Sequence, residues 1–184
     1  MTFKLEIYKG IQKLLLFVMP FFLLINNAFS IEQYTAHGGP VKGLAVSNNN
    51  KYLASASFDY SVVIWNLNPI KENNTLIGHD ASVNTVKFSP SNNLLASGGD
   101  DYKVILWKIS EPLVKNDEII PNILGKHKGK VVDIDFSKDG KYLLTASWDG
   151  SIGYWDIEKR KNIRFITGHK GPVYSVKFSD DNKY

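Results

Sequence analysis

The chain of 184 residues contains no cysteine. A disulfide framework, a cysteine-ligated zinc site, an iron–sulfur cluster and covalently attached c-type haem are therefore excluded within it. A large excess of one charge sign is also lacking, because 22 basic residues are nearly balanced by 18 acidic ones, for a formal net charge of +4. Nucleic-acid binding needs basic residues gathered on one face, so no nucleic-acid partner is expected. Hydrophobic residues make up 43% of the chain, which is enough to bury a core and excludes disorder.

Residues 1–30 differ from everything that follows. Three lysines, Lys4, Lys9 and Lys13, precede an apolar run of 12 residues, Leu14–Ile25, and Ala28-Phe29-Ser30 has a small residue at each end. This order is typical of a secretory signal peptide, with cleavage expected after Ser30. An uncleaved membrane anchor is the alternative, although a spanning helix needs about 20 apolar residues. In both cases residues 31–184 are expected outside the cytoplasm, periplasmic or secreted, and after cleavage they would not be inserted in a membrane.

The rest of the chain is a repeat. Its four histidines lie at positions 37, 79, 127 and 169, with spacings of 42, 48 and 42. After each of the first three, a Ser or Thr follows at 18 residues, an Asp at 22 and a Trp at 28. The six additional residues between the second and third copies fall around Leu113–Pro121, outside the fixed segments. Fixed periods of this size indicate a repeat architecture.

The segments between these markers alternate with period two, as half-buried strands do. In the second copy, Val83–Ser89, Leu94–Gly98 and Val104–Trp107 each predict a strand. Thr75–Ile77 or Asn162–Ile166 supplies the weaker outer strand. Asn-, Asp- and Gly-rich turns separate them. Each repeat is therefore predicted to form a four-stranded antiparallel sheet with short loops.

The residues that carry these signals resemble WD40 repeats, whose blades build a β-propeller. The resemblance rests on Gly78-His79 at the start of a repeat, Phe88-Ser89-Pro90 at its middle and Trp155-Asp156 at its end, and it covers residues 34–184. It implies an all-β, incomplete WD40 β-propeller with three full four-stranded blades and the start of a fourth, over residues 31–184. Phrases such as Ser147–Gly150 are also similar to exported bacterial WD40 proteins, some of which continue into a c-type cytochrome domain.

The resemblance also implies a role for the repeated His, Ser or Thr, Asp and Trp. In the family, the His bonds the Asp of a tight turn, and the Ser or Thr and the Trp N–H complete a buried hydrogen-bonded chain. By matching offsets, the tetrads are His37–Ser55–Asp59–Trp65, His79–Ser97–Asp101–Trp107 and His127–Thr145–Asp149–Trp155, and His169 begins a fourth.

A catalytic triad is the alternative interpretation of Asp, His and Ser at fixed spacing. A nucleophile should be singular and exposed, whereas these sets occur once per blade, so a structural role is favoured. Histidines in separate sheets lie too far apart to share a metal ion. We therefore expect no enzymatic activity, no metal and no cofactor within these residues. Asp133 and Asp135 share one strand face, but Lys87 and Lys177 stand at the position of Asp135 in sister repeats, which predicts a variable, solvated position.

The last copy ends directly after its first strand, so the chain is interpreted as the front part of a longer protein. A short protein that closes a ring by self-association is the alternative.

The predicted function is a non-enzymatic, extracytoplasmic scaffold that binds a protein or peptide partner. The alternative is an accessory propeller of a periplasmic redox protein, with its c-type cytochrome part beyond the chain end. The resemblance places partner contacts beside the tetrads, before each turn Asp and five residues after each His. These positions are Phe58, Asp100, Trp148, Lys42, Asn84, Val132 and Tyr174. Phe58 and Trp148 could instead pack on neighbouring loops, since the sister residue Asp100 shows that the framework demands no aromatic there.

Overall fold

The computed structural model describes residues 33–179 and residue 181. The chain divides into two units, Met1–Thr35 and Ala36–Tyr184, and every strand belongs to the second. The strands are β1 (Val41–Val46), β2 (Tyr52–Ser57), β3 (Ser61–Leu67), β4 (Ile70–Ile77), β5 (Val83–Phe88), β6 (Leu94–Gly99), β7 (Lys103–Lys108), β8 (Pro121–Lys126), β9 (Val131–Phe136), β10 (Tyr142–Ser147), β11 (Ile152–Asp156) and β12 (Lys161–Ile166). The described residues hold no helix that is long and apolar enough to cross a membrane. The predicted signal peptide or anchor, residues 1–30, lies outside them.

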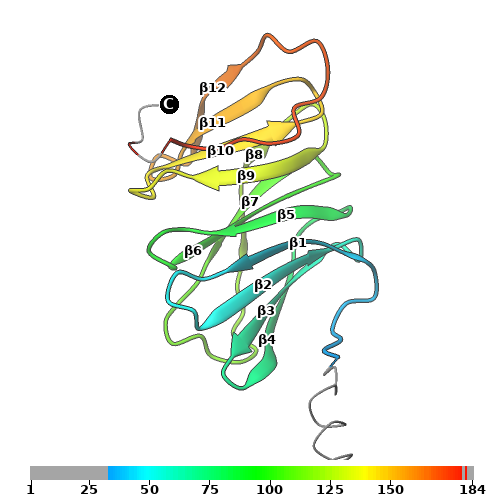
Figure 1. Cartoon of the computed structure of the whole chain (residues 1–184), viewed down its shortest axis with the longest axis vertical. Coiled ribbons are helices and arrows are strands. Elements are labelled where there is room, and N and C mark those ends of the chain that lie inside the picture. The colour runs from blue at the N-terminus through cyan, green and yellow to red at the C-terminus, as the bar shows by residue number, and fades with distance from the viewer. Residues whose placement is uncertain (1–32, 180, 182–184) are drawn as a thin grey trace, which may run out of the picture. The chain divides into compact units, whose positions relative to one another are not determined.

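The strands form three antiparallel four-stranded sheets in chain order: β1-β2-β3-β4, β5-β6-β7-β8 and β9-β10-β11-β12. Equivalent residues occupy equivalent positions in the strand register of each sheet. The tetrad hydroxyl residue on the second strand pairs with a third-strand residue eight positions later in every case: Ser55 with Val63, Ser97 with Ile105 and Thr145 with Gly153. The second sheet lies between the first and the third (Figure 1). The all-β class and the three complete blades predicted from the repeat are confirmed.

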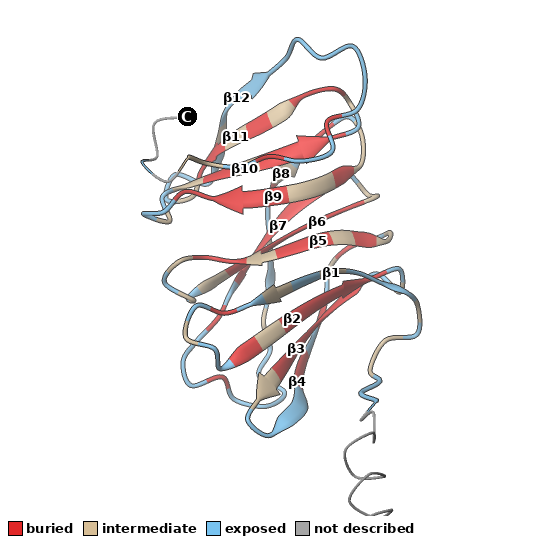
Figure 2. Ribbon diagram, viewed as in Figure 1, coloured by how far each residue is buried: buried red, intermediate tan, exposed pale blue. Residues whose placement is uncertain are grey.

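Apolar side chains that alternate along the strands meet between neighbouring sheets. One core cluster joins the first and second sheets around Ile64, Leu95 and Trp107, and another joins the second and third around Val131 and Trp155. Figure 2 shows that burial is concentrated in the middle strands of each sheet, whereas β12 is largely exposed. Burial of these apolar faces between the sheets is the main source of stability in such a repeat architecture.

The segment that follows β12 is held without forming a regular strand. Val173 and Val176 are buried against Ala146 of β10. The N–H of Val173 donates a hydrogen bond to the carbonyl of Ser147 at 3.0 Å. This segment is where the sequence predicts the first strand of a fourth blade, and in the described residues no sheet hydrogen-bonding pattern extends through it.

The longer connection between β7 and β8 accounts for the irregular spacing of the histidines. Its Leu113 is buried, and the Leu113 N–H donates to the Tyr52 hydroxyl at 3.1 Å. Asn74 of β4 donates to the carbonyl of Asp117 at 3.1 Å. The additional residues therefore pack back onto the first sheet rather than interrupting a blade.

Candidate functional site

The structure brings each sequence-predicted tetrad together. In the third sheet, Trp155 Nε1 donates to Thr145 Oγ1 at 2.8 Å, and His127 Nε2 lies 2.7 Å from the same oxygen. His127 Nδ1 lies 3.1 Å from the Asp149 carboxylate. An indole N–H can only donate, so the Thr145 hydroxyl accepts from Trp155 and donates its own proton to His127. This order leaves the His127 proton on Nδ1, from which it is donated to Asp149.

The other two tetrads repeat this geometry. In the first sheet, His37 lies 2.9 Å from Asp59 and 2.7 Å from Ser55, which accepts from Trp65 at 2.9 Å. In the second, the corresponding distances are 3.0 Å from His79 to Asp101, 2.8 Å from His79 to Ser97 and 2.8 Å from Trp107 to Ser97. His169 is exposed and lies beyond the third sheet.

Sequence reasoning missed a fifth position, two residues after each turn Asp. The hydroxyls of Ser61 and Ser151 each donate to the preceding Asp carboxylate at 2.6 Å. The second sheet has Lys103 instead, a buried ammonium 2.6 Å from Asp80 and 3.8 Å from Asp101. The signal was present in the sequence, because a Ser follows both His37 and His127 by 24 residues.

Hydrogen bonds and burial shift the pKa values of Asp59, Asp149 and His127. Burial raises the pKa of Asp149, but hydrogen bonds from the Ser151 hydroxyl and from the Lys128 and Ser151 N–H groups outweigh it and bring the pKa to about 2. The pKa of Asp59 is likewise about 2, because hydrogen bonds from Ser61 and Gly38 outweigh its burial. Burial lowers the pKa of His127 despite the neighbouring Asp149 carboxylate. The carboxylates are therefore ionised and His127 is neutral near pH 7.

This arrangement does not present a nucleophile. Thr145 and Ser97 are fully buried and Ser55 is 3% exposed. Each hydroxyl already accepts from a Trp and donates to a His, so it has neither a free path to substrate nor a free base. Within residues 33–179 and 181, no group of three or more His, Asp or Glu side chains is placed to hold a metal ion.

A second group of side chains lies beside the first and third tetrads. Phe58 and Trp148 are in the turns before β3 and β11, and their neighbours come from β1, from the residue before β9 and from the segment after β12. Phe58 is 41%, Trp148 45% and Tyr174 66% exposed. The Lys42 ammonium lies 5.0 Å from the centre of the Phe58 ring. The Trp148 ring has the Lys130 ammonium at 5.2 Å and the Tyr174 ring edge-on at 6.1 Å. We call Lys42, Phe58, Lys130, Trp148 and Tyr174 the aromatic–lysine face.

The remaining sequence-predicted contact positions are engaged within the protein. The Asn84 amide donates to Asp100 at 2.8 Å and to the Val131 carbonyl at 3.0 Å. Asp100 also accepts from Lys130 at 2.6 Å, which links the second sheet to the third. Val132 is half-buried and packs against the Val173 and Val176 cluster, so it offers little surface to a partner. Lys130 was missed because its counterparts three residues after His37 and His79 are Pro40 and Ser82.

The prediction that Asp133 and Asp135 are solvated is wrong for Asp135. Asp135 is 6% exposed, and Lys87 and Lys177 lie 3.6 Å and 3.7 Å from its carboxylate. Asp133 is half-buried and accepts from the Ser175 hydroxyl at 2.6 Å. The lysines at sister positions indicated exposure in the sequence, but in the folded chain they neutralise the carboxylate between them.

Comparison with known proteins agrees with this geometry. The family model for "WD domain, G-beta repeat" matches residues 29–66, 70–108, 120–156 and 160–184. The chain therefore belongs to the WD40 repeat family, a class of β-propeller domains that act as protein-interaction scaffolds.

Among curated proteins, the chain is 27% identical over 153 residues to transcription initiation factor TFIID subunit 5 of Caenorhabditis elegans, which covers 83% of this chain and 22% of that protein. It is 48% identical over 42 residues to F-box-like/WD repeat-containing protein TBL1X of Mus musculus, covering 23% of this chain and 8% of that protein. It is 44% identical over 43 residues to the general transcriptional corepressor TUP1 of Saccharomyces cerevisiae, covering 23% of this chain and 6% of that protein. The chain thus spans less than a quarter of the length of these relatives.

Proposed function

We propose that this chain is a non-enzymatic scaffold that acts outside the cytoplasm and binds a protein or peptide partner through the aromatic–lysine face. The observation that supports the proposal is the exposure of Phe58 and Trp148, each with a lysine ammonium 5.0–5.2 Å from its ring centre. The scaffold role follows from the family, and the face and the location are the specific parts of the proposal.

Exposed aromatic rings with a neighbouring cation are typical of residues that dominate binding energy at protein interfaces. Trp148 is held by Lys130 and Tyr174, so little side-chain entropy would be lost when a partner covers it. Asp100 at the sister position forms hydrogen bonds instead, which shows that the blade framework does not require a ring there. An aromatic ring that the framework does not require is better explained by contact with a partner.

The location rests on the composition of residues 1–30. Three lysines, a 12-residue apolar run and Ala28-Phe29-Ser30 are the order of a secretory signal. Intact-mass analysis of the exported product tests this part, and the expected N-terminal residue is Ile31. A membrane-bound product that retains Met1 would favour an anchor, and a cytoplasmic product that retains it would overturn the proposed location.

The binding face is tested by replacing Phe58 and Trp148 with Ala together and comparing partner recovery in a quantitative pull-down. The double variant should lose about 2 kcal/mol or more of binding free energy. Its free energy of unfolding should stay within about 1 kcal/mol of the wild-type value. A matched control replaces Ile70 and Val114, which are 42% and 55% exposed and lie away from this face, with Ala. Equal recovery by the wild type and the Phe58–Trp148 variant would overturn the proposed face.

A further inference from the structure

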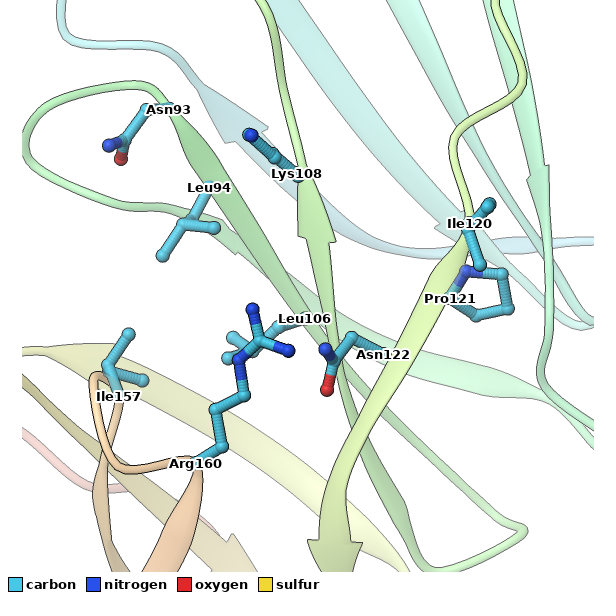
Figure 3. Close-up of a pocket in the computed structure, with 9 residues that line it drawn as sticks. All are labelled: Asn93, Leu94, Leu106, Lys108, Ile120, Pro121, Asn122, Ile157 and Arg160. Carbon is cyan, nitrogen blue, oxygen red and sulfur yellow. The ribbon is translucent and has the colours of Figure 1, made fainter.

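A cavity of about 430 Å³ opens between the second and third sheets, at the strand ends opposite to the His and Asp residues of the tetrads. Its walls come from β6, β7 and β8 on one side and from the turn between β11 and β12 on the other (Figure 3). This volume falls within the range of about 300–1,000 Å³ that is typical of ligand pockets. The lining residues are Asn93, Leu94, Leu106, Lys108, Ile120, Pro121, Asn122, Ile157 and Arg160.

The floor of the cavity is apolar and fixed by the core. Leu106 is 5% exposed and belongs to the core cluster between the second and third sheets, and Ile157 packs against the same cluster. Leu106 and Lys108 lie two residues apart on β7, so they share one face of the sheet. Leu94 is paired with Lys108 in the register of β6 and β7, which places it on that face as well. The face therefore changes from apolar at its centre to cationic at its end.

The rim carries positive charge that nothing in the cavity neutralises. Arg160 and Lys108 line the cavity, and none of the nine lining residues is Asp or Glu. Within residues 33–179 and 181, neither the Arg160 nor the Lys108 side chain forms a hydrogen bond or an ion pair. Figure 3 shows the Arg160 side chain rising from its turn with the guanidinium directed towards Leu106 and Asn122. Asn93 and Asn122 add amide groups that can bond a peptide backbone.

We propose that this cavity binds the C-terminal end of a partner polypeptide whose last residue is apolar. The carboxylate and the side chain of a C-terminal residue leave the same Cα, so one residue can reach both the cationic rim and the apolar floor. The guanidinium of Arg160 can bind a carboxylate with two parallel hydrogen bonds, and Lys108 adds a second cation. Leu94, Leu106 and Ile157 receive the side chain. An internal Asp or Glu could place its carboxylate at the rim, but a second, apolar residue would then have to fill the floor. A small cavity accommodates one C-terminal residue more readily than two internal residues.

The test uses the full chain and fluorescently labelled five-residue peptides that end in Leu, Ile, Val or Phe, measured by fluorescence anisotropy. At least one peptide with a free carboxylate should bind, and its C-terminal amide should bind about tenfold or more weakly, because a hydrogen bond to a charged group is worth about 1.5–3 kcal/mol. An amidated peptide with an internal Asp-Leu pair measures binding to a side-chain carboxylate. Arg160→Gln should weaken binding of the free-carboxylate peptide by a similar factor. The matched control Arg164→Gln, on β12 and outside the cavity, should leave this binding unchanged.

Equal binding of the acid and amide peptides, tighter binding of the internal-Asp peptide, equal effects of the two Arg substitutions or no binding by any peptide would overturn the proposal. Replacing Phe58 and Trp148 with Ala should leave this binding unchanged, because both residues lie at the opposite strand ends. A failure of the aromatic–lysine face is thereby distinguished from a failure of this cavity.

Discussion

The Asp135 carboxylate accepts a hydrogen bond from the backbone N–H of Phe178 at 2.9 Å. Asp133, two residues earlier on β9, does the same for the N–H of Val176 at 2.9 Å. Two carboxylates on one strand face thus bind alternate N–H groups of the segment that follows β12. They hold that segment beside the third sheet, where the sequence predicts the first strand of a fourth blade.

Replacing Asp135 with Ala should release the Phe178 N–H. Lys87 and Lys177 have exposed side chains that water can solvate after the substitution, so the main cost is the lost hydrogen bond, about 1–3 kcal/mol. Amide hydrogen exchange resolved at Phe178 should accelerate accordingly. Asp117→Ala, at an exposed residue of the β7–β8 connection, is the control and should leave that exchange unchanged. Protection that persists in Asp135→Ala would show that the carboxylate does not hold the segment.

The shared hydroxyl of each tetrad gives a second prediction. Thr145→Val keeps the side-chain shape but leaves the Trp155 N–H and His127 Nε2 without a partner in a buried site. The free energy of unfolding should fall by about 1–3 kcal/mol, measured by urea denaturation. Thr145→Ser is the matched control, because Ser55 and Ser97 occupy the same position in the sister tetrads, and it should recover most of the loss. Equal stability of the Val variant and the wild type would contradict the role of the hydroxyl.

The depressed pKa of Asp149 predicts a loss of stability in acid. Its pKa is about 2 in the folded chain, against about 3.9 for an unfolded Asp. The ionised form is favoured by folding, so this stabilisation is present above about pH 4 and disappears as the pH falls towards 2. Asp149→Asn should flatten the dependence of the denaturation midpoint on pH in that window. Ser151→Ala should move the window upwards, because it removes a hydrogen bond that lowers the pKa. An unchanged profile in both variants would contradict this assignment.

The repeat offsets were sufficient to predict the three sheets and the membership of each tetrad, because residues at identical offsets occupy identical registers. Contacts between blades could not be obtained in the same way. The Asp135 carboxylate lies between Lys87 of β5, in the second sheet, and Lys177 of the segment after β12. Lys130 lies beside Asp100 and Trp148 through a position that no sister repeat shares. A repeat period describes what blades have in common, whereas these contacts depend on how they differ.

The cavity between the second and third sheets could not be predicted from the repeat period either. Arg160 follows Lys108 by 52 residues, which is more than one repeat period, and nothing in the repeat spacing brings them together. They line one cavity because the β11–β12 turn reaches across the face formed by β6, β7 and β8. Four residues of the aromatic–lysine face stand at positions that the resemblance predicts, whereas its Lys130 and this cavity require the arrangement of neighbouring blades.

The tautomer and charge of His127 give the last prediction. A histidine beside a carboxylate commonly has a raised pKa, but burial of the His127 ring outweighs Asp149 and lowers the pKa. Folding therefore favours the neutral ring, and its contribution to stability is complete above about pH 6.5 and declines as the pH falls below that value. Imidazole nitrogen NMR of the folded chain should show a proton on Nδ1 and none on Nε2 at pH 6.5. Asp149→Asn should lower the His127 pKa further, since it removes the one neighbouring group that raises it. A His127 titration midpoint at or above 6.5 in the wild type would contradict the lowered pKa of this ring.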